Sequence, residues 1–159
     1  MRHTLAVLVE NQPGVLSHVA GLFSRRGYNI DSLVVGETED PGISRITLVV
    51  EGDEKVIEQV SKQLNKQVEV IKVNDITNEK IVERQLLLLK VAADTAIRME
   101  IMQIVEIFRC RIVDIGKRSL IVEATGDEEK IEAIIRSLRP FGIQELVRTG
   151  KVAMVRGTK

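Results

Sequence analysis

Two segments of the chain repeat each other, and this repeat limits the folds that the chain can adopt. Residues 52–58 read GDEKVIE and residues 126–132 read GDEEKIE. In both places an apolar stretch precedes the segment, and apolar residues at helical spacing follow it. The order of the surrounding patterns also corresponds. The sequence therefore predicts a tandem of two similar structural units.

Length and composition fit this arrangement. The chain has 159 residues, 44% of them hydrophobic, which suffices for one ordinary domain or two small ones. Lys plus Arg and Asp plus Glu both number 23, and the chain has no Trp and one Tyr. A balanced charge and few aromatic rings argue against nucleic acid or an anionic membrane as partner. Because the apolar run at residues 5–9 is too short for a signal or a membrane span, we expect a cytoplasmic protein.

The first copy alternates strand and helix patterns in a defined order. A strand at residues 3–10 is apolar on both faces in its middle, which predicts a central position in a sheet. The further elements are a helix from Val15 that ends before Gly27, strands at 28–38 and 43–51, a helix opened by residues 52–54, and a strand at 68–73. This order is typical of the ferredoxin-like plan, an antiparallel four-stranded sheet with both helices on one face.

The second copy gives the same order after the polar stretch 74–79, which we interpret as a linker. Its predicted elements are a strand at 82–93, a helix through 97–108, a hairpin of 111–115 and 120–125, a helix with Ile131, Ile134, Ile135 and Leu138 on one face, and a last strand at 143–147. The predicted fold class is therefore α+β, with two tandem βαββαβ units. The predicted domains are residues 1–74 and 80–159.

The start of the first helix has features of an anion-binding site. We expect the amide of Asn11 to bond free backbone groups there, while Pro13 and Gly14 shape the turn into the helix. Unpaired N–H groups and the helix dipole can hold a carboxylate or phosphate, and Gly14 leaves room for it. The glycine patterns of phosphate loops and dinucleotide sites are absent, so a small carboxylate is favoured. The alternative is that Pro13 and Gly14 only form a turn.

The corresponding turn in the second copy is different. Residues 93–96 lack the Pro-Gly pair and contain Asp94, whose carboxylate would occupy the place of a ligand's carboxylate. The second copy is therefore not expected to bind the same ligand.

No catalytic residue and no metal site is predicted. His3 and His18 are the only histidines, neither has neighbours at metal-ligand or triad spacing, and we expect both to be exposed. Cys110 is the only cysteine and is expected to be a buried apolar thiol, without an intramolecular disulfide. The acidic residues gather in turns and at helix starts, where they need no catalytic role. The pattern favours a binding protein over a catalyst.

Three segments of the first copy carry a family resemblance. Residues 5–16 (LAVLVENQPGVL), 21–33 (GLFSRRGYNIDSL) and 44–50 (SRITLVV) resemble the regulatory small subunit of acetolactate synthase, also called acetohydroxyacid synthase. The first copy resembles an ACT domain. The resemblance extends into the second copy at residues 82–86 and 106–109.

The resemblance implies a function as well as a fold. It implies a non-catalytic subunit that binds a branched-chain amino acid, usually valine, and that stimulates and feedback-regulates a separate catalytic subunit in valine, leucine and isoleucine biosynthesis. That partner would carry thiamine diphosphate, magnesium and FAD, and would condense pyruvate with pyruvate or 2-oxobutyrate. None of these cofactors is expected in this chain.

The resemblance also implies a site at the interface of two ACT domains in a homodimer. One chain would contact the carboxylate and ammonium, and the partner chain would close the site. The residues implied are Asn11, Gly14, Val15 and Leu16 from one chain, with Asn29 and Ile30 from the other. The ordinary alternatives are a turn residue for Asn29 and a core position for Ile30. Pairing of the second strand, expected at the sheet edge, would also remove unpaired backbone groups.

Two other functions stay open from the sequence. One is a free-standing ACT-type amino-acid sensor that controls another enzyme or a transcription factor. The other is a small ferredoxin-like enzyme such as a mutase or cyclase, which the lack of an acid–base constellation disfavours.

Overall fold

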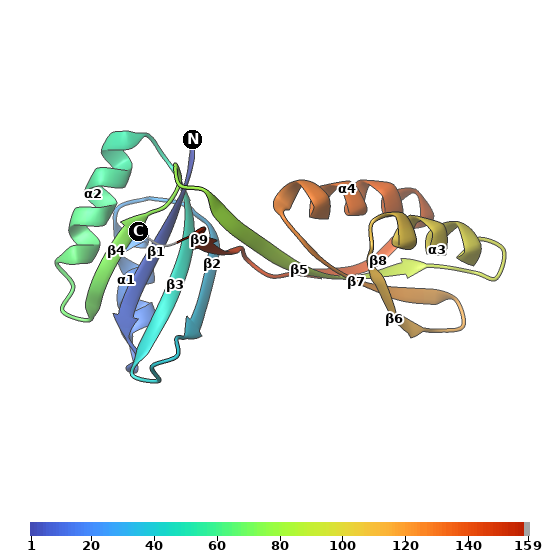
Figure 1. Ribbon diagram of the computed structural model, residues 1–159, viewed down its shortest axis with the longest axis horizontal. Helices are drawn as coiled ribbons and strands as arrows, with labels where there is room; N and C mark the ends of the chain where they lie inside the picture. Colours follow the sequence, from blue (N-terminus) through green and yellow to red (C-terminus); the bar gives the residue numbers. More distant parts are fainter. Residues whose placement is uncertain (158–159) are drawn as a thin grey trace. The chain divides into compact units, whose positions relative to one another are not determined.

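The computed structural model describes residues 1–157 and divides the chain into two compact units. The first unit comprises Met1–Val82 together with the chain from Lys151 on, and the second comprises Glu83–Gly150. Figure 1 labels the elements of both. None of the helices within residues 1–157 is long and apolar enough to cross a membrane.

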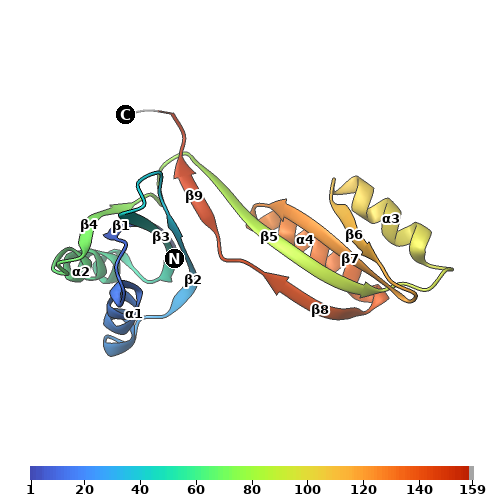
Figure 2. The same ribbon diagram turned by 90° about the horizontal axis from the view of Figure 1, so that it is seen from below.

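The first unit has the ferredoxin-like plan that the sequence predicts. Its strands are β1 (Arg2–Glu10), β2 (Ile30–Glu37), β3 (Ile43–Glu51) and β4 (Val70–Asp75), and its helices are α1 (Val15–Arg25) and α2 (Glu54–Asn65). The strand order is β2-β3-β1-β4, with antiparallel neighbours. Figure 2 shows both helices on the same side of this sheet. The predictions of a central β1 and an edge β2 are confirmed.

The core of the first unit lies between this sheet and the two helices. Alternate residues of β1 and β3 point toward the helices, as the period of two in a strand requires. The buried side chains are Leu5, Val7, Val9, Ile46, Leu48 and Val50 from the sheet, and Val15, Val19, Leu22, Phe23, Ile57, Val60 and Leu64 from the helices. After α1, Gly27 has φ +71°, the left-handed conformation expected where this helix ends.

The second unit repeats the plan. Its elements are β5 (Ile81–Ala92), α3 (Arg98–Ile107), β6 (Arg111–Ile115), β7 (Ser119–Gly126), α4 (Glu128–Leu138), the 3₁₀ turn Arg139–Phe141 and β8 (Ile143–Arg148), with strand order β6-β7-β5-β8. Leu87 and Leu89 are fully buried, whereas Leu86 and Leu88 are 37% and 40% exposed. The run of four leucines is thus one strand with alternating faces.

The end of the chain differs from the prediction. A ninth strand, β9 (Val152–Val155), follows β8 and pairs with β5, so 143–147 is not the last strand. Ala153 packs with Ala6 and Ile76, which places β9 in the first unit rather than in the predicted domain 80–159. This cluster covers the side of β1 that faces away from the helices. A strand of four residues has too short a pattern to predict from sequence.

The predicted linker is also part of the first unit. Asp75 still belongs to β4, and the backbone N–H of Ile76 donates to the carbonyl of Thr4 at 2.9 Å. Ile76 is only 4% exposed. Residues 74–79 are therefore fixed against β1, and the polar composition that suggested a linker reflects their position at the surface. β4 begins at Val70 instead of Val68, which is 91% exposed.

Candidate binding site

The start of α1 has the geometry that the sequence predicts for an anion-binding site. Gly14 precedes the helix with φ +86°, and no atom lies within 4 Å of the position that a Cβ would take. No side chain caps the helix, and its first turn contains no acidic residue. The N–H of Val15 forms a long bond, 3.4 Å, to the carbonyl of Gln12. The first turn of α1 therefore presents donors and a positive dipole end without a negative group of its own.

The other three α-helices within residues 1–157 each have a carboxylate at the cap position or in the turn that leads into the helix. Asp53 accepts a hydrogen bond from the N–H of Val56 at the start of α2, and Asp127 accepts one from Lys130 at the start of α4, both at 2.9 Å. Before α3, Oδ1 of Asp94 accepts from the N–H groups of Ala96 and Ile97 at 2.9 and 3.1 Å. In the second unit the carboxylate of Asp94 thus bonds the turn before its first helix, whereas no carboxylate does so at the start of α1.

Asn11 does not bond the start of α1, and that prediction is wrong. Its side-chain Nδ2 donates to Oε1 of Glu37 at 3.2 Å and to the carbonyl of Pro41 at 2.9 Å. Its backbone N–H donates to the carbonyl of Gly42 at 2.9 Å. Asn11 therefore ties the loop before α1 to the end of β2 and the turn after it. The cause is the left-handed Gly14, which stands at the cap position itself.

Val15 and Leu16 begin α1 and face different ways. Val15 is 4% exposed and packs in the core, so only its backbone N–H is available to a ligand. Leu16 is 43% exposed. The structure therefore places one apolar side chain, that of Leu16, at the surface beside Gly14.

Asn29 and Ile30 lie at the other end of β2. Asn29 is exposed and donates to Oδ1 of Asp31 at 2.8 Å, while Ile30 packs against the core. Because Glu37 at the end of β2 contacts Asn11, the start of this eight-residue strand is about 23 Å away at 3.3 Å per residue. One chain does not bring Asn29 and Ile30 to Gly14.

Glu37 is the neighbour of this site that sequence reasoning missed. It belongs to a run of acidic residues interpreted as solvated, and its contact with Asn11 spans 26 positions of the chain. No local signal could have identified this contact. The structure places an exposed carboxylate beside the loop that leads into α1.

The two histidines and the cysteine differ in their exposure to solvent. His18 is exposed, as expected, with Nδ1 at 3.0 Å from Oε1 of Glu69, and the pKa of Glu69 is lowered by a backbone hydrogen bond and by His18. His3 is 1% exposed, so the prediction of an exposed His3 is wrong; it shares the inward face of β1 with Leu5. Cys110 is half-buried, and burial raises the pKa of its thiol. Residues 1–157 contain no group of three acidic, His or Cys side chains suited to a metal ion.

Comparison with known proteins identifies the family. Residues 5–72 match the family described as AHAS small subunit-like ACT domain, and residues 84–157 match the family described as small subunit of acetolactate synthase. The chain belongs to the acetolactate synthase small-subunit family. Its first unit is an ACT domain, as the resemblance implied.

Individual relatives cover the whole length of the chain. A probable acetolactate synthase small subunit from Archaeoglobus fulgidus is 61% identical over 159 residues, which are 100% of this chain and 99% of the relative. The small subunit from Bacillus subtilis is 49% identical and is covered to 93%. The crystal structure of the small subunit from Thermotoga maritima superposes with a TM-score of 0.92 at 46% identity, covering 100% of this chain and 99% of that one.

Family membership has two direct consequences. A small subunit with an ACT domain has a regulatory role, and it implies a large catalytic subunit as partner. The family model described as small subunit of acetolactate synthase covers residues 84–157, so the second unit is a regular part of such a subunit.

Proposed function

We propose that this chain binds a branched-chain amino acid, with valine as the preferred effector, across two ACT domains of a homodimer. Binding stimulates and feedback-regulates the catalytic subunit of acetolactate synthase in valine, leucine and isoleucine biosynthesis. The observation that carries this proposal is the start of α1, where Gly14 leaves the helix without a cap or an acidic residue.

The carboxylate of the amino acid fits this helix start. Amino acids carry a carboxylate at neutral pH, and the first turn of a helix binds anions through its N–H groups and its dipole. Gly14 adds no side chain, and the space where its Cβ would stand is empty to 4 Å. The backbone N–H groups of Val15 and Leu16 follow it directly. We therefore assign the carboxylate to Gly14, Val15 and Leu16.

The ammonium group requires a negative or carbonyl partner nearby. Glu37, at the end of β2, is exposed. It accepts a hydrogen bond from Asn11, which lies in the loop that leads into α1. A carboxylate beside an ammonium attracts it most strongly where water is partly excluded. We assign the ammonium to Glu37, with Asn11 as the residue that positions it.

The proposed homodimer forms along β2. This edge strand carries Leu33 and Val35, which are 36% and 41% exposed although they pair in register with the buried Leu48 and Ile46. Antiparallel pairing of two β2 strands would cover these side chains and use the free sheet edge. Pairing centred on the middle of β2 would also bring the start of one strand, with Ile30, near the end of the other, with Glu37. Asn29 and Ile30 could then close the site that Gly14 opens, which they cannot do within one chain.

The chemistry of the complex belongs to its partner in this proposal. We expect the catalytic subunit to hold thiamine diphosphate, magnesium and FAD, and this chain to hold none of them. An effector can change the activity of that partner by no more than its differential affinity for the two states of the complex, typically ~1–3 kcal/mol.

Reconstitution tests the proposed function. The purified chain is added to the catalytic subunit of the same organism, and acetolactate formation from pyruvate is measured with and without valine. We expect the chain alone to be inactive, the mixture to exceed the catalytic subunit alone, and valine to change the rate of the mixture only. If the chain neither raises the rate nor makes it respond to a branched-chain amino acid, the proposed function is wrong.

A further inference from the structure

The chain returns from the second unit to the first at Gly150. The residues on both sides of Gly150 are fixed by hydrogen bonds, which we call anchors. On the second-unit side, the N–H of Thr149 donates to the carbonyl of Leu86, and the N–H of Leu86 donates to Oγ1 of Thr149, both at 3.0 Å. On the first-unit side, the N–H of Lys151 donates to Oγ of Ser32 at 2.9 Å. Only Gly150 separates the two anchors.

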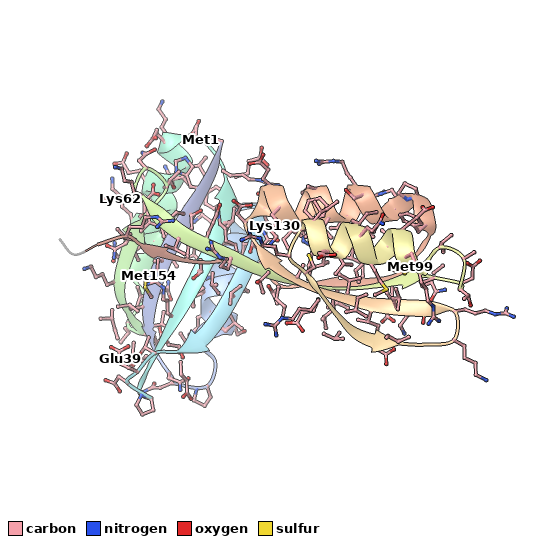
Figure 3. The ribbon with its side chains drawn as sticks, turned by 45° about the vertical axis from the view of Figure 1, so that its right-hand side comes forward. Met1, Glu39, Lys62, Met99, Lys130 and Met154 are labelled. Carbon is pink, nitrogen blue, oxygen red and sulfur yellow. The ribbon has the colours of Figure 1, made fainter. Side chains whose placement is uncertain are left out.

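The returning segment, residues 151–156, is held along its length, and we call it the strap. Arg45 donates from Nη2 to the carbonyl of Ala153 at 2.6 Å. The N–H and Nε of Arg156 donate to the carbonyls of Lys80 and Ile81 at 2.7 and 3.2 Å. The side chain of Ala153 is 6% exposed against Ala6 and Ile76. Figure 3 labels Met154, whose side chain belongs to this segment.

Two strap anchors stand on the strands that form the proposed effector edge. Ser32 belongs to β2, two positions after Ile30, and Arg45 on β3 pairs in register with Gly36. Glu37 and the contact with Asn11 follow at the next position of β2. A displacement or stiffening of β2 would therefore act on Lys151 directly through Ser32, and on Ala153 through Arg45 of the paired strand β3.

We propose that the strap couples effector occupancy at the β2 edge to the second unit, with Ser32 and Arg45 as its positioning residues. This inference rests on the proposed function and adds a route for its regulation. Coupling between sites is carried by packed and hydrogen-bonded contacts that change together. A ligand that holds β2 firmly also holds the acceptor of the Lys151 N–H, and Gly150 alone separates Lys151 from the hydrogen-bonded Thr149.

Hydrogen exchange and regulation of the reconstituted enzyme test this proposal together. In the wild-type chain, valine should slow amide exchange in residues 151–156 as well as in β2. The Ser32→Ala and Arg45→Met variants should bind valine with an affinity within about twofold of wild type. The change that valine causes in the rate of the reconstituted enzyme should fall by about two- to thirtyfold in these variants, the range for contacts within a coupling network.

Two matched variants separate coupling from a general effect on stability. Ser32→Thr keeps a hydroxyl at the same position and should retain the wild-type response. Ser61→Ala removes a hydroxyl from α2, away from the strap, and should also respond as wild type.

The outcomes distinguish this inference from the proposed function. If the wild-type chain binds no branched-chain amino acid, the proposed function itself fails. If the wild type binds and responds, but Ser32→Ala and Arg45→Met respond equally, the strap does not carry the coupling. Should either variant fold poorly, unchanged exchange of residues 151–156 in the wild type on valine binding overturns the inference by itself.

Discussion

Gly14 is the residue on which the proposed site depends most. Its φ of +86° lies in the left-handed region, which costs most residues roughly 1–2 kcal/mol but which Asn and Asp adopt with less strain. No atom stands within 4 Å of a Cβ placed there. Substitution by Asn or Asp should therefore leave the fold nearly intact, and the two variants differ mainly in charge.

Replacing Gly14 with Asp should abolish valine binding. The new carboxylate would occupy the helix N-terminus and repel the carboxylate of the effector, whereas Gly14→Asn adds a side chain of the same shape without the charge. Calorimetric titration measures both affinities, and circular dichroism checks the fold. We expect Gly14→Asn to bind more tightly than Gly14→Asp. Unchanged affinity in Gly14→Asp would refute the site.

Glu37 provides a second test at the residue scale. Glu37→Gln keeps an oxygen that can accept from Asn11 but removes the charge, so it should weaken valine binding by about tenfold or more, as for a lost charge-assisted hydrogen bond. Binding of 3-methylbutanoate, which has the carboxylate and the apolar group of valine but no ammonium, should be unaffected.

The neighbouring acid supplies the control. Glu39 is exposed in the turn that follows β2, and Figure 3 labels it there. Glu39→Gln should bind valine like the wild type. Two results would show that Glu37 does not bind the ammonium. One is an equal loss of valine affinity in Glu37→Gln and Glu39→Gln. The other is that Glu37→Gln loses as much affinity for 3-methylbutanoate as for valine.

At the scale of elements, β2 has the central role because it is both the sheet edge and the proposed dimer contact. Val35→Lys should convert the dimer to a monomer, since a lysine on the paired edge is a common means of preventing strand association. Analytical ultracentrifugation over a range of concentrations measures this. Valine binding should be lost as well, because in the proposed dimer the second copy supplies Asn29 and Ile30.

Val68 offers a matched control for this substitution. It is 91% exposed before β4, so Val68→Lys adds the same charge away from β2 and should leave the dimer intact. A wild-type chain that is monomeric at all concentrations, with or without valine, would contradict the role of β2.

The elements that the sequence predicts are those with a long local pattern. α1 follows from apolar residues at helical spacing and from Gly27, and the pairing of β2 with β3 follows from the turn at residues 40–42. β9 could not be predicted, because four residues set no clear period and their partners, Ala6 and Ile76, lie far away in the sequence.

The site divides in the same way. The open helix start at Gly14 is a local property, and the sequence predicts it. The contact between Asn11 and Glu37 is not local, and the sequence wrongly assigns Asn11 to the helix start. The burial of His3 depends on its position two residues before Leu5 on the inward face of β1, a signal that was present but weak for one polar residue.

At the scale of the whole molecule, one structural plan occurs twice, and among the α-helices of residues 1–157 only α1 has neither a side-chain cap nor an acidic residue in its first turn. Asp94 accepts hydrogen bonds in the turn that leads into α3, while the start of α1 has no carboxylate of its own. The proposed amino-acid site therefore lies in the ACT unit, and the chain passes between the two units within β5 and at Gly150.

Thermal unfolding of the purified chain against a panel of amino acids tests the central claim most directly. A ligand at about 100 times its Kd adds ~2.7 kcal/mol to the native state, which corresponds to about 5–10 °C in Tm for a chain of this size. We predict such a shift with valine, none with glycine or lysine, and none with valine in Gly14→Asp. No shift with valine, leucine or isoleucine, either for the chain alone or in complex with its catalytic subunit, would contradict the account.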